Sequence, residues 1–148
     1  VEAQAKQVMQ RQIDRTAEYP EMRARLEMHL QETENQQKRL EDILADMGES
    51  HSTLKDAALG AMGNLMAMGH AVATDEVIKN SLENSAFEHY EVAMYKSLLT
   101  MADAVGVTRA APLLQESLAE EEHMAAWVDE HIAEVTRTYL HRHAKGDL

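Results

Sequence analysis

The sequence predicts an all-α protein, a bundle of helices, from three observations. Its 148 residues include only 2 Pro and 6 Gly, while residues with strong helix propensity are abundant. Apolar residues recur at spacings of three, four and seven, which is the pattern of a helix with one buried face. No pattern typical of strands appears. A chain of this length forms one domain with a single core.

The first two expected helices meet at Tyr19-Pro20. The first covers residues 1–17, and the second covers residues 20–47. Proline separates them because it is tolerated in a first helical turn but not in a helix interior. Gly48 is a suitable C-terminal stop for the second helix.

A third helix is expected over residues 53–73, with Ser50 or Ser52 as its cap. Three glycines inside it indicate close contact with another helix, within the chain or across a dimer. They are Gly60, Gly63 and Gly69.

The fourth helix is expected to begin after Thr74 and to continue to Val105, where Gly106 ends it. The fifth is capped by Thr108 and runs to about Tyr139. The expected domains are a helical bundle, residues 1–140, and a polar C-terminal tail, residues 141–148.

The net charge of −12 argues against nucleic acid as a partner, because phosphates require a basic patch. It also disfavours anionic membrane surfaces, whereas a cation would be attracted. With no Cys, the chain has no disulfide and no thiolate metal site. No apolar run long enough to span a bilayer and no secretory signal is found, so the cytoplasm is the expected location.

Charged residues interrupt the predicted core at several places. Glu88 and Glu91 lie three residues apart and therefore share one helix face, which is predicted to be buried. Glu121 falls on the core line of the last helix, between Leu118 and Ala125. An unpaired carboxylate in an apolar core is costly, and buried charges are normally paired or bound to a metal. Carboxylates that converge inside a helical bundle are typical of a dinuclear metal site.

The second helix adds a polar strip that contains His29, Glu32 and Gln36. His29 can bind the same metal as Glu32, or orient that carboxylate through a hydrogen bond. Glu2 is the carboxylate far enough up the first helix to reach this level of the bundle. The candidate metal ligands are therefore Glu2, His29, Glu32, Glu88, Glu91 and Glu121.

The number of residues between each side chain and the nearest turn tests whether the side chains lie at the same height along the bundle axis. Glu91 precedes Gly106 by as many residues as Glu121 follows it, so an antiparallel hairpin brings the two carboxylates together. Glu2 and Glu32 lie at unequal distances from Tyr19, which leaves a mismatch of roughly 6 Å at a rise of about 1.5 Å per residue.

A literal Glu-x-x-His pair, Glu120 and His123, lies off the predicted core face and is discounted as a ligand pair.

These segments resemble the YciE/YciF family of ferritin-like proteins, and the resemblance covers nearly the whole chain. Its most specific parts are residues 29–33 (HLQET), residues 39–41 (RLE), residues 87–91 (FEHYE) and residues 118–122 (LAEEE).

The resemblance implies a four-helix ferritin-like bundle with one additional helix, a homodimer, and a di-iron or similar dinuclear centre. It assigns carboxylate positions to Glu2, Glu32, Glu88 or Glu91, and Glu121. Asn35 and Met124 stand where more distant ferritin-like proteins have histidine, and His29 is a substitute on the preceding turn. A site rich in carboxylates favours iron or manganese over copper or zinc.

Two functions fit these features. The first is a stress-associated dinuclear metal protein that reacts with oxygen or peroxide. The second is a non-enzymatic stress or scaffold bundle that binds metal weakly or not at all, as the missing histidine pair suggests. Iron storage is a third possibility that would require a cage-forming assembly, and nothing in the sequence indicates one.

Overall fold

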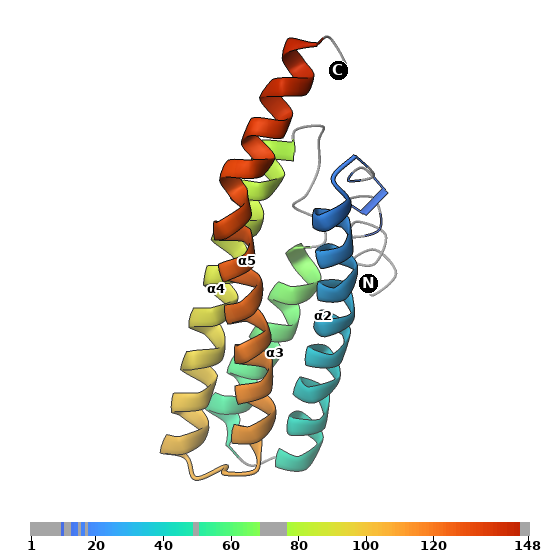
Figure 1. The fold of residues 1–148 in the computed structure, drawn as a ribbon. Helices are drawn as coiled ribbons and strands as arrows, with labels where there is room; N and C mark the ends of the chain where they lie inside the picture. Colours follow the sequence, from blue (N-terminus) through green and yellow to red (C-terminus); the bar gives the residue numbers. More distant parts are fainter. Residues whose placement is uncertain are drawn as a thin grey trace.

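Four helices make up most of the chain that the structure describes (Figure 1). They are α2 (Pro20–Met47), α3 (Ser52–Met68), α4 (Val77–Ala104) and α5 (Ala110–Ala144). The computed structural model describes residues 10, 13, 14, 16, 18–48, 51–68 and 77–145, with side chains over the same residues except 64–68. No strand occurs among these residues. The prediction of an all-α bundle is confirmed, and the arrangement is consistent with a ferritin-like fold.

The helices run alternately up and down, and the turns after α2 and α4 lie at the same end of the bundle (Figure 1). The most extensive contact joins α4 to α5, while α2 packs on α3 and α5, and α3 on α4. None of the described helices is both long and apolar enough to cross a membrane.

Most of the first predicted helix, including Glu2, lies outside the described residues, as do Gly69 and the expected end of the third helix. Within residues 1–17, Gln10, Ile13 and Asp14 are helical and Thr16 lies in a turn.

The ends of α2 and α4 follow from two glycines with positive φ. Gly48 (φ 56°) follows α2 and Gly106 (φ 74°) follows α4, and glycine adopts this left-handed region without steric cost. At Gly106 the chain closes a Schellman motif, because the Val107 amide donates to the Ala102 carbonyl at 2.9 Å and the Gly106 amide to the Asp103 carbonyl at 3.1 Å. Both predicted stops are therefore confirmed.

Two predictions about helix ends need correction. Thr108 does not cap α5, since Arg109 occupies the N-cap position without a side-chain hydrogen bond and the carbonyl of Thr108 accepts from the Ala111 amide. The helix also continues past Tyr139 to Ala144, and its last turn contains two histidines and Arg142, which stabilise a helix C-terminus when charged.

Of the two close contacts predicted for the glycines of α3, the one within the chain is not seen at Gly60 and Gly63 among the described residues, and the one across a dimer stays a prediction. A Cβ atom built on either residue would meet no atom within 4 Å. No neighbouring helix within the described chain therefore requires glycine at these two positions.

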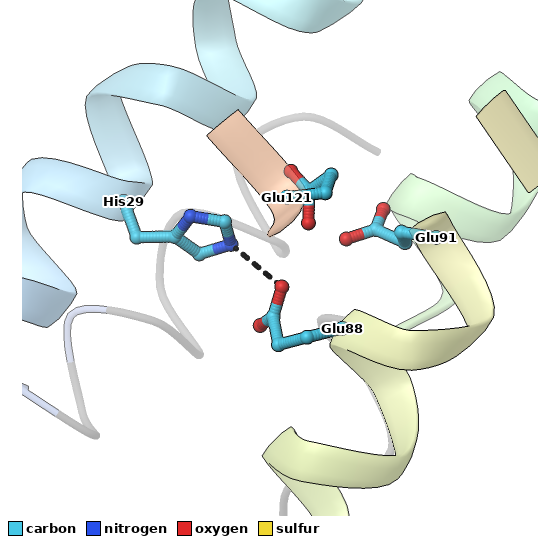
Figure 2. A group of neighbouring side chains, drawn as sticks. All are labelled: His29, Glu88, Glu91 and Glu121. Carbon is cyan, nitrogen blue, oxygen red and sulfur yellow. Dashed lines mark ion pairs between the residues drawn. The ribbon is translucent and has the colours of Figure 1, made fainter. Parts of the chain in front are cut away.

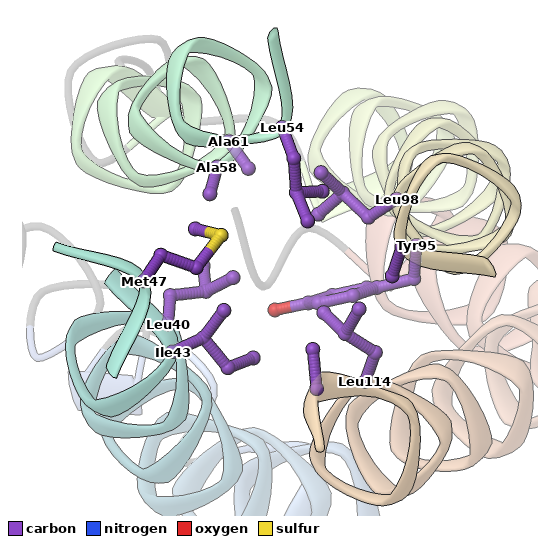
Figure 3. Packing of buried hydrophobic residues seen from close by; sticks show 11 residues of the cluster. Leu40, Ile43, Met47, Leu54, Ala58, Ala61, Tyr95, Leu98 and Leu114 are labelled. Atoms are coloured by element: carbon purple, nitrogen blue, oxygen red, sulfur yellow. The ribbon is translucent and has the colours of Figure 1, made fainter. Parts of the chain in front are cut away.

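Apolar side chains form a main cluster at the end of the bundle that holds the two turns. All four helices contribute, as Figure 3 shows for Leu40 and Ile43 of α2, Leu54 of α3, Leu98 of α4 and Leu114 of α5. A smaller cluster lies at the start of α2 and in the later part of α5, and it consists of Tyr19, Met22 and Val135. Between these clusters in sequence, α2, α4 and α5 each carry buried polar residues, and this polar layer contains the candidate site.

The main cluster is expected to dominate stability. We predict that Leu40→Ala lowers the free energy of unfolding of the metal-free protein by about 2–5 kcal/mol, because Leu40 is fully buried and the substitution leaves a cavity. Urea unfolding measures this effect. Leu59→Ala is the matched control, since Leu59 is 49% exposed and its loss should cost no more than about 0.5 kcal/mol. Equal effects of the two substitutions would contradict the assignment of the core.

Candidate metal centre

Polar residues occupy positions on three helices that the helical period directs inward. On α2 the buried polar positions are Arg25, His29 and Gln36, and the buried positions from Leu40 onward are apolar. On α4 the buried carboxylates of Glu88 and Glu91 precede Tyr95 and Leu98 on the same face. On α5 the buried Ser117 and Glu121 lie between Leu114 and Met124. The helix faces that carry apolar core residues in other turns therefore carry polar and charged groups in these turns.

Four of these side chains converge on one point, as Figure 2 shows. His29 comes from α2, Glu88 and Glu91 from α4, and Glu121 from α5, and one ligand atom of each lies within 4.8 Å of the others. The four residues are only 0–6% exposed. The predicted alignment of Glu91 with Glu121 across the α4–α5 hairpin is therefore seen in the structure.

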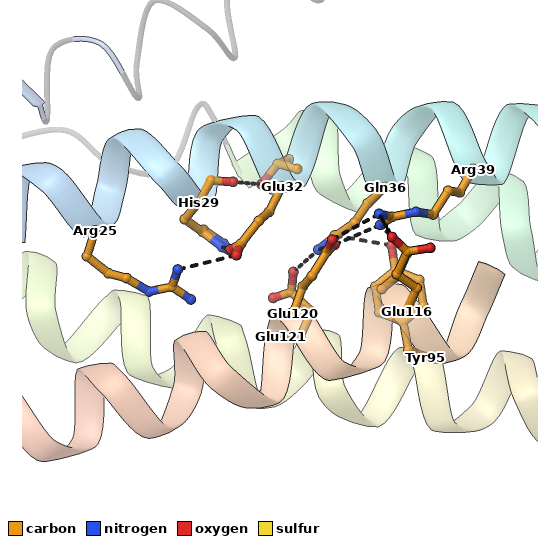
Figure 4. Close-up of polar contacts among 11 residues, drawn as sticks. Arg25, His29, Glu32, Gln36, Arg39, Tyr95, Glu116, Glu120 and Glu121 are labelled. Carbon is orange, nitrogen blue, oxygen red and sulfur yellow. Dashed lines mark hydrogen bonds and ion pairs between the residues drawn. The ribbon is translucent and has the colours of Figure 1, made fainter. Parts of the chain in front are cut away.

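Glu32 lies beside this group instead of within it (Figure 4). Its carboxylate accepts from His29 Nδ1 at 3.0 Å and from Arg25 Nη1 at 3.3 Å, and its side chain is 19% exposed. The other ring nitrogen, His29 Nε2, lies 3.3 Å from Glu88 Oε2. Glu32 thus fixes the orientation of the imidazole, and His29 faces the carboxylates. Glu2, the remaining predicted ligand, lies outside the described residues.

Gln36 holds Glu121 in place and was not among the predicted site residues. It is fully buried, and its Nε2 donates to Glu121 Oε1 and, at 3.1 Å, to Glu120 Oε2. The Tyr95 hydroxyl donates to Gln36 Oε1 at 3.3 Å, which directs the amide nitrogen toward the carboxylates. The spacing in the sequence could have identified Gln36, because it lies seven residues after His29 and therefore on nearly the same face of α2.

Two arginines of α2, Arg25 and Arg39, flank the site; Arg39 was expected to continue the polar strip, and neither was among the predicted ligands. Arg25 is buried and pairs with Glu32, and it lies one turn before His29. Arg39 joins α2 to α5 through Glu120 Oε2 at 2.7 Å, Glu116 Oε1 at 2.7 Å and Ser117 Oγ at 3.2 Å (Figure 4). This network fixes the α2–α5 contact directly beside Glu121.

The discounted residues of α5 lie away from the four converging side chains. Glu120 pairs with Arg39, His123 is exposed, and Glu122 lies 2.9 Å from Lys96 at the surface. Glu120 and His123 are therefore not among the four converging side chains.

The four carboxyl groups fall into two kinds, because the pKa is lowered in two of them and raised in the other two. Burial alone would raise the pKa of Glu88, but the charge and hydrogen bond of His29 outweigh it and the pKa is lowered. Glu32 behaves in the same way, with His29 and Arg25 lowering its pKa. Burial and then the charge of Glu88 raise the pKa of Glu91 to about 8. Burial and then the charge of Glu91 raise the pKa of Glu121 to about 11.

His29 is the positively charged partner of the two ionised carboxylates, Glu32 and Glu88. Burial lowers its pKa, but the charge of Glu88 and the hydrogen bonds with Glu32 and Glu88 outweigh burial, so the pKa is raised well above its ordinary value. At neutral pH the metal-free site therefore holds two positive groups, His29 and Arg25, against two negative groups, Glu32 and Glu88. Glu91 and Glu121 carry protons.

Each of the two protonated residues has one buried oxygen atom that faces the centre of the group. Within the described part of the chain, no amide, imidazole or hydroxyl group donates to Glu91 Oε1 or Glu121 Oε2. Glu88 Oε2 lies 3.3 Å from His29 Nε2. Buried polar atoms are normally satisfied, so these oxygens are suited to bind a cation.

The chain resembles proteins from bacteria in sequence and in structure. A family described as a domain of unknown function (DUF892) matches residues 1–141. Protein YciF of Escherichia coli (strain K12) is 34% identical over 100 residues, which cover 63% of this chain and 58% of YciF, less than two thirds of that relative. A crystal structure of a protein from Xanthomonas campestris pv. campestris has a TM-score of 0.62 and 24% identity, and the match covers 97% of this chain and 88% of that one.

Protonation of Glu121 should make the stability of the metal-free protein depend on pH. The unfolded chain loses these protons above its ordinary pKa of 4.5, while the folded chain keeps them up to the raised pKa values of Glu91 and Glu121. Since the folded state then binds more protons, stability falls as pH rises between about 5 and 8. We predict that Glu121→Gln removes part of this loss and raises the Tm of chelator-treated protein at pH 8 by roughly 2–8 °C.

The readout for this prediction is the difference in Tm between the two proteins, followed by circular dichroism from pH 5 to 8. The difference should shrink toward pH 5, where the Glu121 carboxyl is protonated in the folded state and increasingly so in the unfolded state. A difference that does not vary with pH would contradict a raised pKa at Glu121.

Proposed function

The chain belongs to the DUF892 family and is a relative of Protein YciF, and we propose that it is a ferritin-like protein whose buried centre binds two ions of iron or manganese. The observation that carries this proposal is the convergence of His29, Glu88, Glu91 and Glu121 from three helices at one buried point. Side chains that project from facing helices into a bundle are how such centres are built.

The chemistry of the donor set favours iron or manganese. Three carboxylates and one imidazole are oxygen-rich ligands, and such sites suit these ions better than copper, while the chain has no thiolate to offer. Once the protons of Glu91 and Glu121 are lost, a cation would satisfy the buried oxygens that no amide, imidazole or hydroxyl group of the described residues contacts.

The charge of the site supports two ions. Fully deprotonated, Glu32, Glu88, Glu91 and Glu121 carry four negative charges against the one positive charge of Arg25. Glu2 would add a fifth carboxylate, for a net charge of −4, which two divalent ions would balance. Glu88, Glu91 and Glu121, together with His29, would hold the ions, and Glu32 would support them through its contact with His29.

The residues of the chain prepare this site before any ion binds. Tyr95 orients Gln36, and Gln36 holds Oε1 of Glu121, so that Oε2 of the same carboxylate stays free. Glu32 holds the Nδ1 side of His29, so that Nε2 faces the carboxylates. The apolar layers on either side limit access of bulk water. Bound iron or manganese would supply electrons for the reduction of oxygen or peroxide.

A second candidate is a scaffold bundle that binds no metal. It is favoured by the balance of charges in the metal-free site, where His29 and Arg25 offset Glu32 and Glu88 while the other two carboxyl groups are protonated. Met124 also occupies the position at which a second histidine ligand would lie, and it is buried and apolar. This candidate predicts that chelators leave the Tm unchanged.

Elemental analysis of protein purified from its own host without added metal separates the two candidates. We predict about two iron or manganese atoms per chain in the wild type and at least a fivefold lower content in Glu121→Gln, because the substitution removes the central anionic ligand. Glu122→Gln is the matched control, since Glu122 is exposed on the same helix. Metal far below one per chain that anaerobic reconstitution does not restore would favour the scaffold.

Reactivity is tested separately on metal-loaded protein. We predict that the loaded wild type consumes hydrogen peroxide at least tenfold faster than Glu121→Gln prepared in the same way, while Glu122→Gln matches the wild type. Consumption is followed with a peroxide electrode, and free metal at the same concentration is the blank. Full metal content without consumption of peroxide or oxygen would leave a metal-binding protein that is not an oxidoreductase.

The proposal also covers the cellular role, the location and the oligomeric state of the protein. A stress-associated role and a homodimer are expected from the family resemblance, while a cytoplasmic location is expected from the sequence, in which no secretory signal was found. Size-exclusion chromatography with light scattering tests the assembly, because a dimer, a monomer and a cage differ widely in mass, and a cage would support iron storage instead.

A further inference from the structure

A second group of side chains of the types that can bind metals lies where the first turn of α2 approaches residues 131–134 of α5. It consists of Glu21, His131 and Glu134, and one ligand atom of each lies within 4.8 Å of the others. His131 Nε2 lies 4.0 Å from Glu21 Oε2, which is too long for a hydrogen bond. Two ligands of one ion at about 2.0–2.2 Å from it can lie up to roughly 4 Å apart, so the separation suits a shared cation.

His131 is held in the form that binds metals. Its Nδ1 lies 2.7 Å from the Trp127 carbonyl, and because a carbonyl only accepts, Nδ1 must carry the hydrogen. In the neutral ring this leaves the lone pair of Nε2 directed at the two carboxylates. The ring also stacks on Trp127, with centroids 4.0 Å apart and planes tilted by 13°. A hydrogen bond from the second ring nitrogen to a carbonyl is the usual support of a metal-binding histidine.

The surroundings of this group are open and acidic. A cavity of about 250 Å³ is lined by Glu18, Tyr19, Glu21, Trp127, His131 and Glu134 among others. Glu18 pairs with Arg142 at 3.2 Å, but within the described residues no Lys or Arg forms an ion pair with Glu21 or Glu134. These two carboxylates and the imidazole therefore face a space that a hydrated cation can enter.

An apolar layer separates this group from the buried centre. Glu21 lies eight residues before His29, and His131 lies ten residues after Glu121, which corresponds to about 12–15 Å along the helices. The space between is lined by side chains that include Met22, Leu26, Met124 and Val128, and it encloses only about 10 Å³. The two places should therefore bind ions independently.

We propose that Glu21, His131 and Glu134 form a peripheral binding site for a divalent transition-metal ion. One imidazole and two carboxylates suit ions of the Zn²⁺ and Co²⁺ class better than Mg²⁺, which prefers oxygen ligands alone. Three protein ligands leave further coordination positions open to water, as the exposed position of Glu21 and Glu134 requires.

Trp127 is the single tryptophan of the chain and reports on this site directly. The experiment titrates chelator-treated protein with Co²⁺, a paramagnetic quencher, and follows Trp127 fluorescence. We expect saturable quenching that Zn²⁺ reverses by competition and that a large excess of Mg²⁺ does not. Glu134→Gln and His131→Gln should each weaken Co²⁺ binding at least tenfold. Glu134→Gln leaves the stacked pair of rings intact, so it separates loss of a ligand from loss of the stacking.

Two controls keep the outcome specific. His123→Gln replaces an exposed histidine elsewhere on α5 and should titrate as the wild type does. Glu121→Gln removes the central ligand of the buried site and should leave the quenching unchanged, since that site is separate. Quenching that rises linearly without saturation, that survives both Glu134→Gln and His131→Gln, or that is lost in Glu121→Gln would overturn the peripheral site.

Discussion

Three carboxyl groups buried between helices impose the constraint on which the rest of this structure depends. Glu88, Glu91 and Glu121 lie at positions where neighbouring turns of the same helices carry apolar core. A carboxylate loses its hydration there and must gain a partner or a proton. In the metal-free protein one carboxylate gains His29 and the other two gain protons. The same requirement explains why α2 carries polar residues on its inward face opposite them.

This requirement extends outward from the carboxylates to a second set of residues. Gln36 is needed because it donates to Glu121, and Tyr95 is needed because it fixes the direction of that amide. Arg39 then ties α2 to α5 through Glu120 beside the same turn. Together these contacts hold three helices at one separation and one rotation. The site therefore depends on the packing of the bundle, and the packing depends on the site.

Much of this arrangement could be predicted from the sequence because a few residues determine the ends of the helices. Pro20 and Gly48 bound α2, and Gly106 ends α4 through its positive φ. Once that turn is located, counting equally far in each direction along the chain places Glu91 opposite Glu121. The start of α5 was harder to predict, because Thr108 is a good cap by residue type but is used within the turn itself.

The site was predicted less completely than the fold. Glu32 was grouped with the ligands from the polar strip of α2 and the family resemblance, and it lies beside the four converging side chains, where it contacts His29 Nδ1. Gln36 lies only about 20° around α2 from His29 and reaches Glu121. Gln36 was predicted only as part of the polar strip and Arg25 was not named, because amides and arginines are usually exposed, and only their buried partners explain their positions. Glu21 and His131 belong to different helices far apart in the sequence, and no spacing along one helix brings them together.

The polar layer between the two apolar clusters also determines how the helices are aligned. Apolar stripes with similar spacing can pack in several alignments that differ by one turn, about 5.4 Å along the axis. A shift of α5 by one turn would move Glu121 away from Gln36 and toward the leucines and methionines next to the site. Each such alternative leaves a charged group without a partner and is therefore disfavoured. The residues that make the candidate metal centre thus also select a single folded arrangement from the several that the apolar pattern alone would permit.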